Sequence, residues 1–452
     1  MESNTLRSIQ RVPLHLVGGI LAQLDSMHQL AAAIKSHRLF LEAFTDNVHT
    51  ITASIVLNQI PEGLLPFAIA VQRSTEIDAA DHDAVRTLLS NLEAALSGPR
   101  STVSSLTSFT PAQVATMSKT YRATERLCQH YVDDVIPIAN ERLQINHSRT
   151  INQGETFRLG RAFLRYQLLC NLFCHGKGKP FPDEEREGRF FSNFSPWVNE
   201  QLTCVYYYLE AKVAEAFDEV AAHDIDWGKL PVFRGFSSFE CSNIQGFLSQ
   251  SLPFLSRVCT SRSYKEWAAL LQLKLVSPHG FDFTPAFNIS WQSPGEPVAQ
   301  ALGLDWRTDP LESYGNTGFE MLGKPHDGLQ DDLASSSFRT WFLVHKGWAL
   351  LDNVCNDRSD ANLFECGYVI WDHPKLDEDA LVPVLQQART LKSHFERVEM
   401  DLEATRLSER RRTDIYWQGG SGYWPLNEID FSRVWGLTKE KKERLLRGWG
   451  LI

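Results

Sequence analysis

The residue types that most often bind metals form only one local cluster in this sequence. Cys170, Cys174 and His175 follow a C-x₃-C-H spacing, which has no second ligand pair at the distance found in zinc fingers. A free cysteine in apolar sequence usually behaves as a small core residue. We therefore expect these residues to pack in the interior, and the sequence predicts neither a metal ion nor another cofactor.

Charged residues give no catalytic assignment either. The neighbouring carboxylates Asp133-Asp134 and Asp331-Asp332 would point about a third of a turn apart on a helix, so they would not converge on one reacting atom. Residues 176–180, GKGKP, lack the spacing of a phosphate-binding loop, and the chain contains no H-E-x-x-H, G-x-S-x-G or G-x-G-x-x-G motif. We expect a protein that is not an enzyme. The alternative is an active site assembled from distant residues near an aromatic-rich region later in the chain.

Arg158, Arg161 and Arg165 share one face of a helix that the apolar residues of 157–173 predict. Such a stripe can hold an anion, but three arginines at helical spacing are more often solvated or paired with carboxylates of neighbouring helices. We expect them to be solvated or paired in this way, and we assign no anion site.

The composition is that of a large folded protein. Of the 452 residues, 43% are hydrophobic, and they include 12 Trp and 26 Phe, which excludes a disordered chain. A net charge of −10 gives no reason to expect nucleic acid as the main partner. No apolar run approaches the roughly 18 residues of a membrane span, and Glu2, Arg7 and Arg11 interrupt the apolar positions that a signal peptide would need. We expect a cytoplasmic or nuclear protein, not secreted and not bound to a membrane.

Apolar residues recur with helical spacing through most of the chain. The clearest run follows 4-3-4-4-4 spacing from Val198 to Phe217. Pro137 is expected to kink or break the helix that opens at Thr110-Pro111. The predicted fold is mainly α, with a short N-terminal three-helix motif followed by a large helical domain and a long aromatic-rich irregular region.

The aromatic-rich region lies between about residues 276 and 333, where Pro, Gly, Asn and Asp are also frequent. Irregular segments longer than about 12–15 residues are usually functional or disordered, and the aromatic content argues against disorder. One interpretation is that the region recognises a target protein; the other is that its rings plug into the helical body. The candidate recognition residues are Trp291, Trp306, Tyr314 and Phe319.

Three parts of the chain follow from these patterns. Residues 1–46 form the N-terminal motif, 47–275 form the helical body, and 276–452 contain the aromatic-rich region and C-terminal helices packed on the body. The densest apolar run of the last part is 367–372, GYVIWD, which is expected to be a short strand or the buried end of a helix.

The segment Val12–Phe44 is the only stretch whose residues imply a partner. Pro13 suits the first position of a helix, and apolar residues occupy much of the circumference of that helix. Ser26 and Gln29 have the spacing of a capping box, which predicts the start of a second helix. Three helices this short have too little core to be stable alone, so another surface must cover some of their apolar side chains.

This segment resembles the F-box motif, which begins with Leu-Pro, continues through an Ile-Leu-x-x-Leu step and ends near an aromatic or basic residue. Three further phrases, GRAFLRYQLLCNLF, FSPWVNEQLTCVYYYLE and GYVIWD, are similar to those of a large group of fungal F-box-like proteins. The motif residues here are Pro13, Ile20-Leu21, Leu24, Leu30, Ile34, His37-Arg38 and Phe40.

The resemblance implies a substrate-receptor subunit of a cullin–RING ubiquitin ligase. Its N-terminal helices would bind a Skp-type adaptor, which connects it to the cullin, and its body would bind an unknown target protein. The alternative is a helical scaffold or regulatory interaction protein unrelated to ubiquitin, in which the N-terminal helices complete the protein's own core. The residues expected to divide between adaptor contact and internal packing are Pro13, Leu14, Leu16, Ile20, Leu21, Leu24, Leu30, Ile34 and Phe40.

Overall fold

The computed structural model confirms a mainly α protein. Every regular element in its described part is a helix, and Asp224 and Tyr423 form an isolated antiparallel bridge. The residues described are 12–97, 106, 108–144, 150–174, 190–191, 194–225, 242–275, 336–348, 361–372, 378–390, 402–424, 443 and 447.

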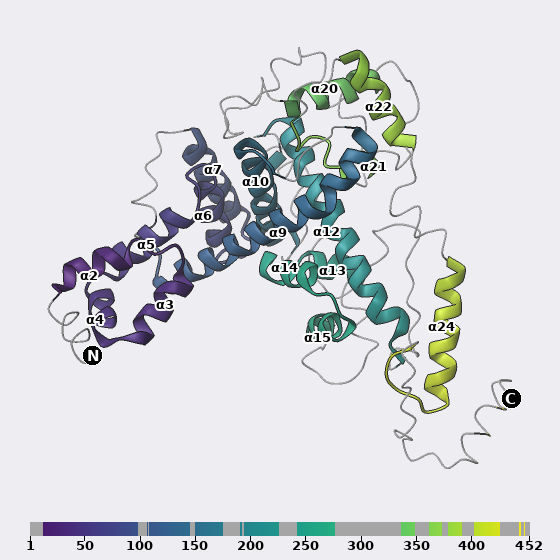
Figure 1. The fold of residues 1–452 in the computed structure, drawn as a ribbon, viewed down its shortest axis with the longest axis horizontal. Coiled ribbons are helices and arrows are strands. Elements are labelled where there is room, and N and C mark those ends of the chain that lie inside the picture. The colour runs from purple at the N-terminus through teal and green to yellow at the C-terminus, as the bar shows by residue number, and fades with distance from the viewer. Residues whose placement is uncertain are drawn as a thin grey trace, which may run out of the picture.

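Four N-terminal helices lie at one end of the molecule (Figure 1). Local sequence sets their boundaries. The Ser26 hydroxyl accepts the Gln29 N–H at 3.3 Å, which is one half of the predicted capping box, whereas Gln29 Oε1 accepts the Asp25 N–H at 3.0 Å and not that of Ser26. His37 Nδ1 accepts the Leu39 N–H at 3.1 Å. These helices are α2 (Leu14–Leu21), α3 (Met27–Ser36), α4 (Arg38–Asp46) and α5 (Val48–Gln59). They enclose a small core of Val17, Leu21, Leu30, Ala43, Ile51 and Ile55.

Helix α5 connects this small core to the main one. Ile51 and Ile55 face α2–α4, whereas Val56 belongs to the core of the body. Near the end of α5, the Gln59 amide donates to the Ser118 carbonyl at 3.3 Å, and the Ser118 hydroxyl donates back to Gln59 at 2.6 Å. The N-terminal helices are therefore held to the body through α5.

The body is built around two long helices that lie centrally in Figure 1, α9 (Pro111–Leu143) and α12 (Pro196–His223). Helix α9 continues past Pro137 without a break, with Val135, Ile136 and Ala139 buried on either side of the proline. Packing therefore offsets the hydrogen bond that proline removes, and the expected break does not occur. Around these two lie α6 (Leu65–Ser74), α7 (His82–Ser97), α10 (Gln153–Leu169) and the π-helical turn η1 (Cys170–Cys174).

The remaining helices extend the body. The chain after residue 242 forms three helices, of which the second has Pro253 in its first turn. Their bounds are α13 (Ser242–Leu248), α14 (Leu252–Thr260) and α15 (Tyr264–Leu275). The C-terminal helices are α20 (Ser336–Trp348), α21 (Ala361–Glu365), α22 (Glu378–Thr390) and α24 (Leu402–Trp417).

The segment 367–372 is not a strand, and of the two expected forms it is closer to the buried end of a helix. It begins at the C-terminal cap of α21, where the Gly367 N–H donates to the Phe364 carbonyl at 2.9 Å and the Tyr368 N–H donates to the Leu363 carbonyl at 3.3 Å. It forms a turn after α21, with Tyr368, Val369, Ile370 and Trp371 all buried. Gly367 starts the turn at φ +63°, where a side chain is strained.

Candidate docking site on the N-terminal helices

Helix α2 has two faces, and the described part of the chain covers only one of them. Val17 and Leu21 point into the small core and are 2% and 1% exposed. Leu16 and Ile20 lie four residues apart on another side of the helix and are 52% and 59% exposed. These two residues, with the exposed Pro13 one turn earlier, are called the α2 face below.

The structure divides the nine predicted adaptor-binding residues into three groups. Two of them, Leu21 and Leu30, are fully buried and serve internal packing. Leu14, Leu24, Ile34 and Phe40 are partly buried against the small core. Pro13, Leu16 and Ile20 remain accessible and form the α2 face.

The two glycines of α2 also differ. A methyl group at Gly18 would lie 3.8–3.9 Å from Asn47, Ala43 and Ile51, so Gly18 packs on the protein's own helices. A methyl group at Gly19 would have no neighbour within 4 Å. Gly19 is exposed between Leu16 and Ile20, and its missing side chain leaves room for another backbone to approach.

The exposed side chains of α2 have a thermodynamic consequence. Fully burying a Leu or Ile side chain stabilises by about 1.5–3 kcal/mol, so covering the exposed halves of Leu16 and Ile20 would contribute roughly 2–3 kcal/mol together. A third large apolar residue, Leu41 of α4, is 47% exposed. This end of the molecule therefore has apolar surface that the described part of the chain does not cover.

The three arginines of α10 do not form an anion site. They are buried rather than solvated, and each is engaged by groups of the protein. Arg158 pairs with the Asp372 carboxylate at 2.7 Å and also donates to the Ile370 carbonyl at 2.8 Å. Arg161 donates to Gln201 Oε1 at 2.7 Å, and Arg165 donates to Asn199 Oδ1 at 2.7 Å.

Arg158 belongs to a polar network that holds the buried turn 367–372. Glu155 Oε1 accepts the Asp372 N–H at 2.8 Å, and Gln201 donates to the Val369 carbonyl at 3.2 Å. These contacts satisfy backbone groups that would be costly to bury alone. The role of this network is to stabilise the turn, because its side chains form hydrogen bonds with backbone groups of the turn.

Sequence reasoning missed the buried carboxylate Glu200. It is 6% exposed and accepts hydrogen bonds from the Tyr368 hydroxyl and, at 3.1 Å, from Trp341 Nε1. In the sequence, Glu200 cannot be told from the other polar residues of α12. Its hydrogen-bond partners Trp341 and Tyr368 lie 141 and 168 residues further along the chain. Only three-dimensional packing brings these groups together.

The expected packing of Cys170 and Cys174 agrees with their burial in η1, whereas His175 lies outside the described residues. Among the residues that the structure describes, no group of His, Cys, Asp and Glu is arranged to hold a metal ion. None of the described helices combines the length and apolar composition needed to cross a bilayer. The candidate recognition residues Trp291, Trp306, Tyr314 and Phe319 also lie outside the described residues.

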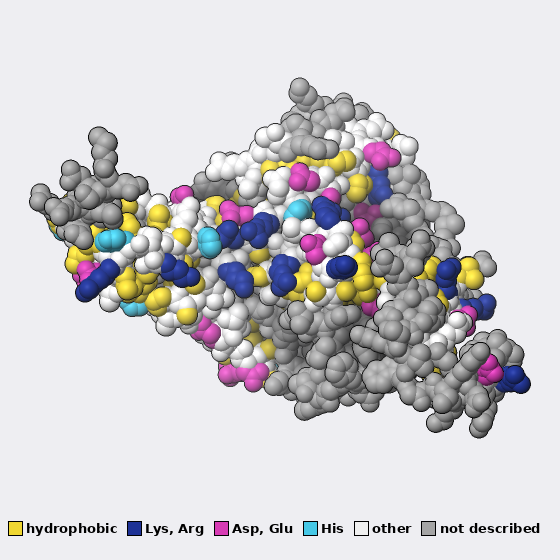
Figure 2. All heavy atoms as spheres, turned by 60° about the horizontal axis from the view of Figure 1, so that its bottom comes forward, with side chains coloured by type: hydrophobic (Ala, Val, Ile, Leu, Met, Phe, Trp, Pro, Cys, Tyr) yellow, Lys and Arg dark blue, Asp and Glu magenta, His cyan; other side chains and the backbone are white. Residues whose placement is uncertain are grey.

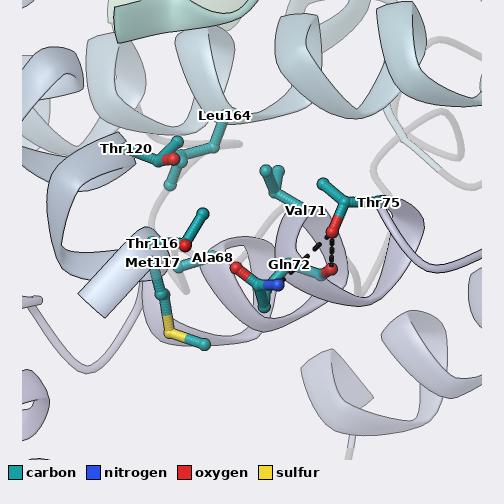
Figure 3. Close-up of a pocket in the computed structure, with 8 residues that line it drawn as sticks. All are labelled: Ala68, Val71, Gln72, Thr75, Thr116, Met117, Thr120 and Leu164. Atoms are coloured by element: carbon teal, nitrogen blue, oxygen red, sulfur yellow. Dashed lines mark hydrogen bonds between the residues drawn. The ribbon is translucent and has the colours of Figure 1, made fainter. Parts of the chain in front are cut away.

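Figure 3 shows a small cavity between α6 and α9. Gln72, Thr75, Thr116 and Thr120 are among its lining residues, and its volume of about 20 Å³ admits one water molecule. The Gln72 amide donates to the Thr75 hydroxyl at 3.3 Å, and that hydroxyl donates to the Gln72 carbonyl at 2.7 Å. The cavity is too small for a substrate, so we regard it as a hydration site.

Comparisons of the chain with models of known protein families, with curated proteins and with solved structures give no match.

Proposed function

We propose that the protein is an F-box-like substrate receptor of a cullin–RING ubiquitin ligase, which binds a Skp-type adaptor through the α2 face. The observation that supports this proposal is the exposure of Leu16 and Ile20 on a helix whose other face is buried in the small core. Exposed apolar residues along one side of a folded helix are typical of a surface that docks on another protein.

The position of the N-terminal helices is suited to this role. They lie at one end of the molecule, and α5 connects them to the body (Figure 1). An adaptor on the α2 face would leave most of the body available to a target protein. In this function the chain supplies binding and orientation, and ubiquitin transfer belongs to other subunits.

The test is direct binding of a purified Skp-type adaptor to the full-length protein. Leu16→Asp with Ile20→Asp places two charges on the α2 face, and we expect it to weaken adaptor binding by at least about a hundredfold. Because both side chains are exposed in the free protein, circular dichroism and thermal unfolding should change little. Leu21 is unsuitable for this test, since it is 1% exposed and a charge there would unfold the small core.

Leu407→Asp is the matched control. Leu407 of α24 is 58% exposed, close to the 59% of Ile20, but it lies on a C-terminal helix away from the α2 face (Figure 1). We expect this variant to bind the adaptor as the unmodified protein does. If neither the unmodified protein nor the control binds an adaptor, the proposed function is wrong.

A helical scaffold unrelated to ubiquitin is the second candidate, and one observation favours it. Ile51 and Ile55 of α5 already complete a core with α2–α4, so these helices do form part of the protein's own structure. Deleting residues 1–46 would expose Ile51 and Ile55 under either function, so aggregation of that deletion would not distinguish them. The scaffold predicts that full-length protein with an intact α2 face binds no adaptor.

A further inference from the structure

Helix α9 has a row of basic side chains on one face. Lys119, Arg122 and Arg126 follow 3-4 spacing, which places them within about 60° around the helix, and His130 continues the same line one turn later. Lys119 and Arg126 are exposed, and Arg122 is half-buried. From Lys119 to His130 the row is about 16 Å long.

The row continues onto the helices packed against α9. His130 Nε2 lies 3.2 Å from the Thr260 hydroxyl at the end of α14, which joins the two helix surfaces. Arg257 of α14 is exposed one turn before Thr260, and Arg262 and Lys265 are exposed just after it. Figure 2 shows Lys and Arg side chains in a row across this side of the molecule. We call Lys119, Arg122, Arg126, Arg257, Arg262 and Lys265 the basic row.

The charges of the basic row are available to a partner. Within the described part of the chain, none of the six residues forms a salt bridge, whereas Lys212 of the neighbouring α12 pairs with Asp134 at 3.1 Å. Carboxylates do lie nearby. Glu125 and Asp133 on α9 and Glu266 on α15 are exposed, and Glu125 interacts electrostatically with Arg122. Asp134 and Glu215 also lie near Cys259 of α14, together with Lys212, so the local count is seven cations against five carboxylates. This leaves a small local positive charge on a protein with a net charge of −10.

We propose that the basic row binds an acidic, Asp- and Glu-rich segment of a partner protein. Complementary charge favours such a segment, and the row offers several guanidinium groups, which pair well with carboxylates. One observation favours it over nucleic acid: carboxylates interrupt the row, and the acidic side chains of a peptide can be spaced to avoid them, whereas a phosphate backbone carries a charge at every nucleotide. The proposal does not depend on adaptor binding at α2, so either one can fail alone.

The geometry sets the length of the segment. An extended peptide rises about 3.3 Å per residue, so five residues span the part of the row on α9, and roughly ten would reach α14 and α15 as well. The appropriate probe is a fluorescein-labelled 12-residue peptide in which Glu alternates with Gly and Ser. Its binding to the full-length protein can be measured by fluorescence anisotropy.

Arg126→Glu with Arg257→Glu reverses one exposed charge on each helix. We expect this variant to bind the probe at least about tenfold more weakly at low salt, since exposed ion pairs are individually weak but add over the row. Binding by the unmodified protein should fall steeply between about 50 and 300 mM NaCl, because salt screens exposed charges. Both side chains are exposed, so circular dichroism and thermal unfolding should be unchanged.

Lys35→Glu with Arg410→Glu is the matched control, since it changes the net charge equally at exposed positions of α3 and α24. It should bind the peptide within about twofold of the unmodified protein. Equal losses in both variants would overturn the proposal, because the effect would then be one of net charge. Tighter binding of a 12-nucleotide single-stranded DNA through Arg126 and Arg257 would overturn it in favour of nucleic acid.

Discussion

At the scale of single residues, α10 shows how spacing and burial carry different information. The 3-4 spacing placed Arg158, Arg161 and Arg165 on one face, and the structure has them there, but all three are buried. Arg158 does pair with a carboxylate, as expected, although Asp372 lies in a buried turn and not on a neighbouring helix. Periodicity identifies the face of a helix, whereas the partner depends on a segment more than 200 positions away.

Arg158→Met tests the energetic role of this ion pair. The substitution leaves the Asp372 carboxylate and the Ile370 carbonyl without the guanidinium, so we expect a loss of about 2–4 kcal/mol in the free energy of unfolding. Urea unfolding followed by circular dichroism measures it. Arg38→Met is the matched control, because the Arg38–Glu42 pair is exposed and should contribute less than about 0.5 kcal/mol. Similar losses in the two variants would contradict the structural role of Arg158.

At the scale of secondary-structure elements, helices were predictable and irregular buried segments were not. Period-3.6 apolar positions and the Ser26 cap located α2, α3, α9, α10 and α12, because those signals are local. The turn 367–372 has the apolar composition of a strand or helix end, but its backbone groups bond to Glu155, Arg158 and Gln201. No local pattern contains those partners. For the same reason, the sequence indicated an apolar α2 but could not tell Leu16 from Leu21.

Gly367→Ala tests whether that turn is as constrained as it looks. A methyl group there would lie 2.5 Å from the Tyr131 hydroxyl, and φ is +63°. We expect a loss of at least about 2 kcal/mol in the free energy of unfolding, since positive φ and steric overlap both oppose a side chain. Gly246→Ala in α13 is the control: a methyl group has no neighbour within 4 Å there, so this variant should be neutral or more stable. A neutral Gly367→Ala would show that the turn relaxes easily.

At the scale of the whole molecule, the chain has two candidate interaction surfaces. The α2 face and the basic row lie on separate parts of the described surface, one on the N-terminal helices and one on the body. The sequence predicted the region that contains the α2 face but gave no sign of the basic row. The two parts of the basic row meet where α9 contacts α14, and these contacting residues are 130 positions apart in the chain. Contacts between distant elements create such surfaces.

Buried cysteine thiols should make the stability of the protein depend on pH in the alkaline range. Burial raises the pKa of the Cys259 and Cys366 thiols to about 12, above the value of about 9 in an unfolded chain. Above pH 9 the unfolded state releases these protons while the folded state keeps them, so stability is full below pH 9 and falls as pH rises toward 12. Each thiol should contribute a slope of up to about 1.4 kcal/mol per pH unit.

Urea unfolding at several pH values between about 8 and 11 measures this slope. Cys259→Ala with Cys366→Ala should be less stable near pH 8, since it leaves cavities, but should lose stability less steeply at higher pH. An equal slope in the variant and the unmodified protein would mean that these thiols do not carry the effect.

The most direct test of the account is amide hydrogen exchange in the full-length protein, with and without a purified Skp-type adaptor. Binding at the α2 face should slow exchange of the amides in and around α2 (Leu14–Leu21) and leave those of α14 (Leu252–Thr260) unchanged. Unchanged exchange in α2 at saturating adaptor, or slowed exchange only in the body, would contradict the proposal that this helix is the docking surface.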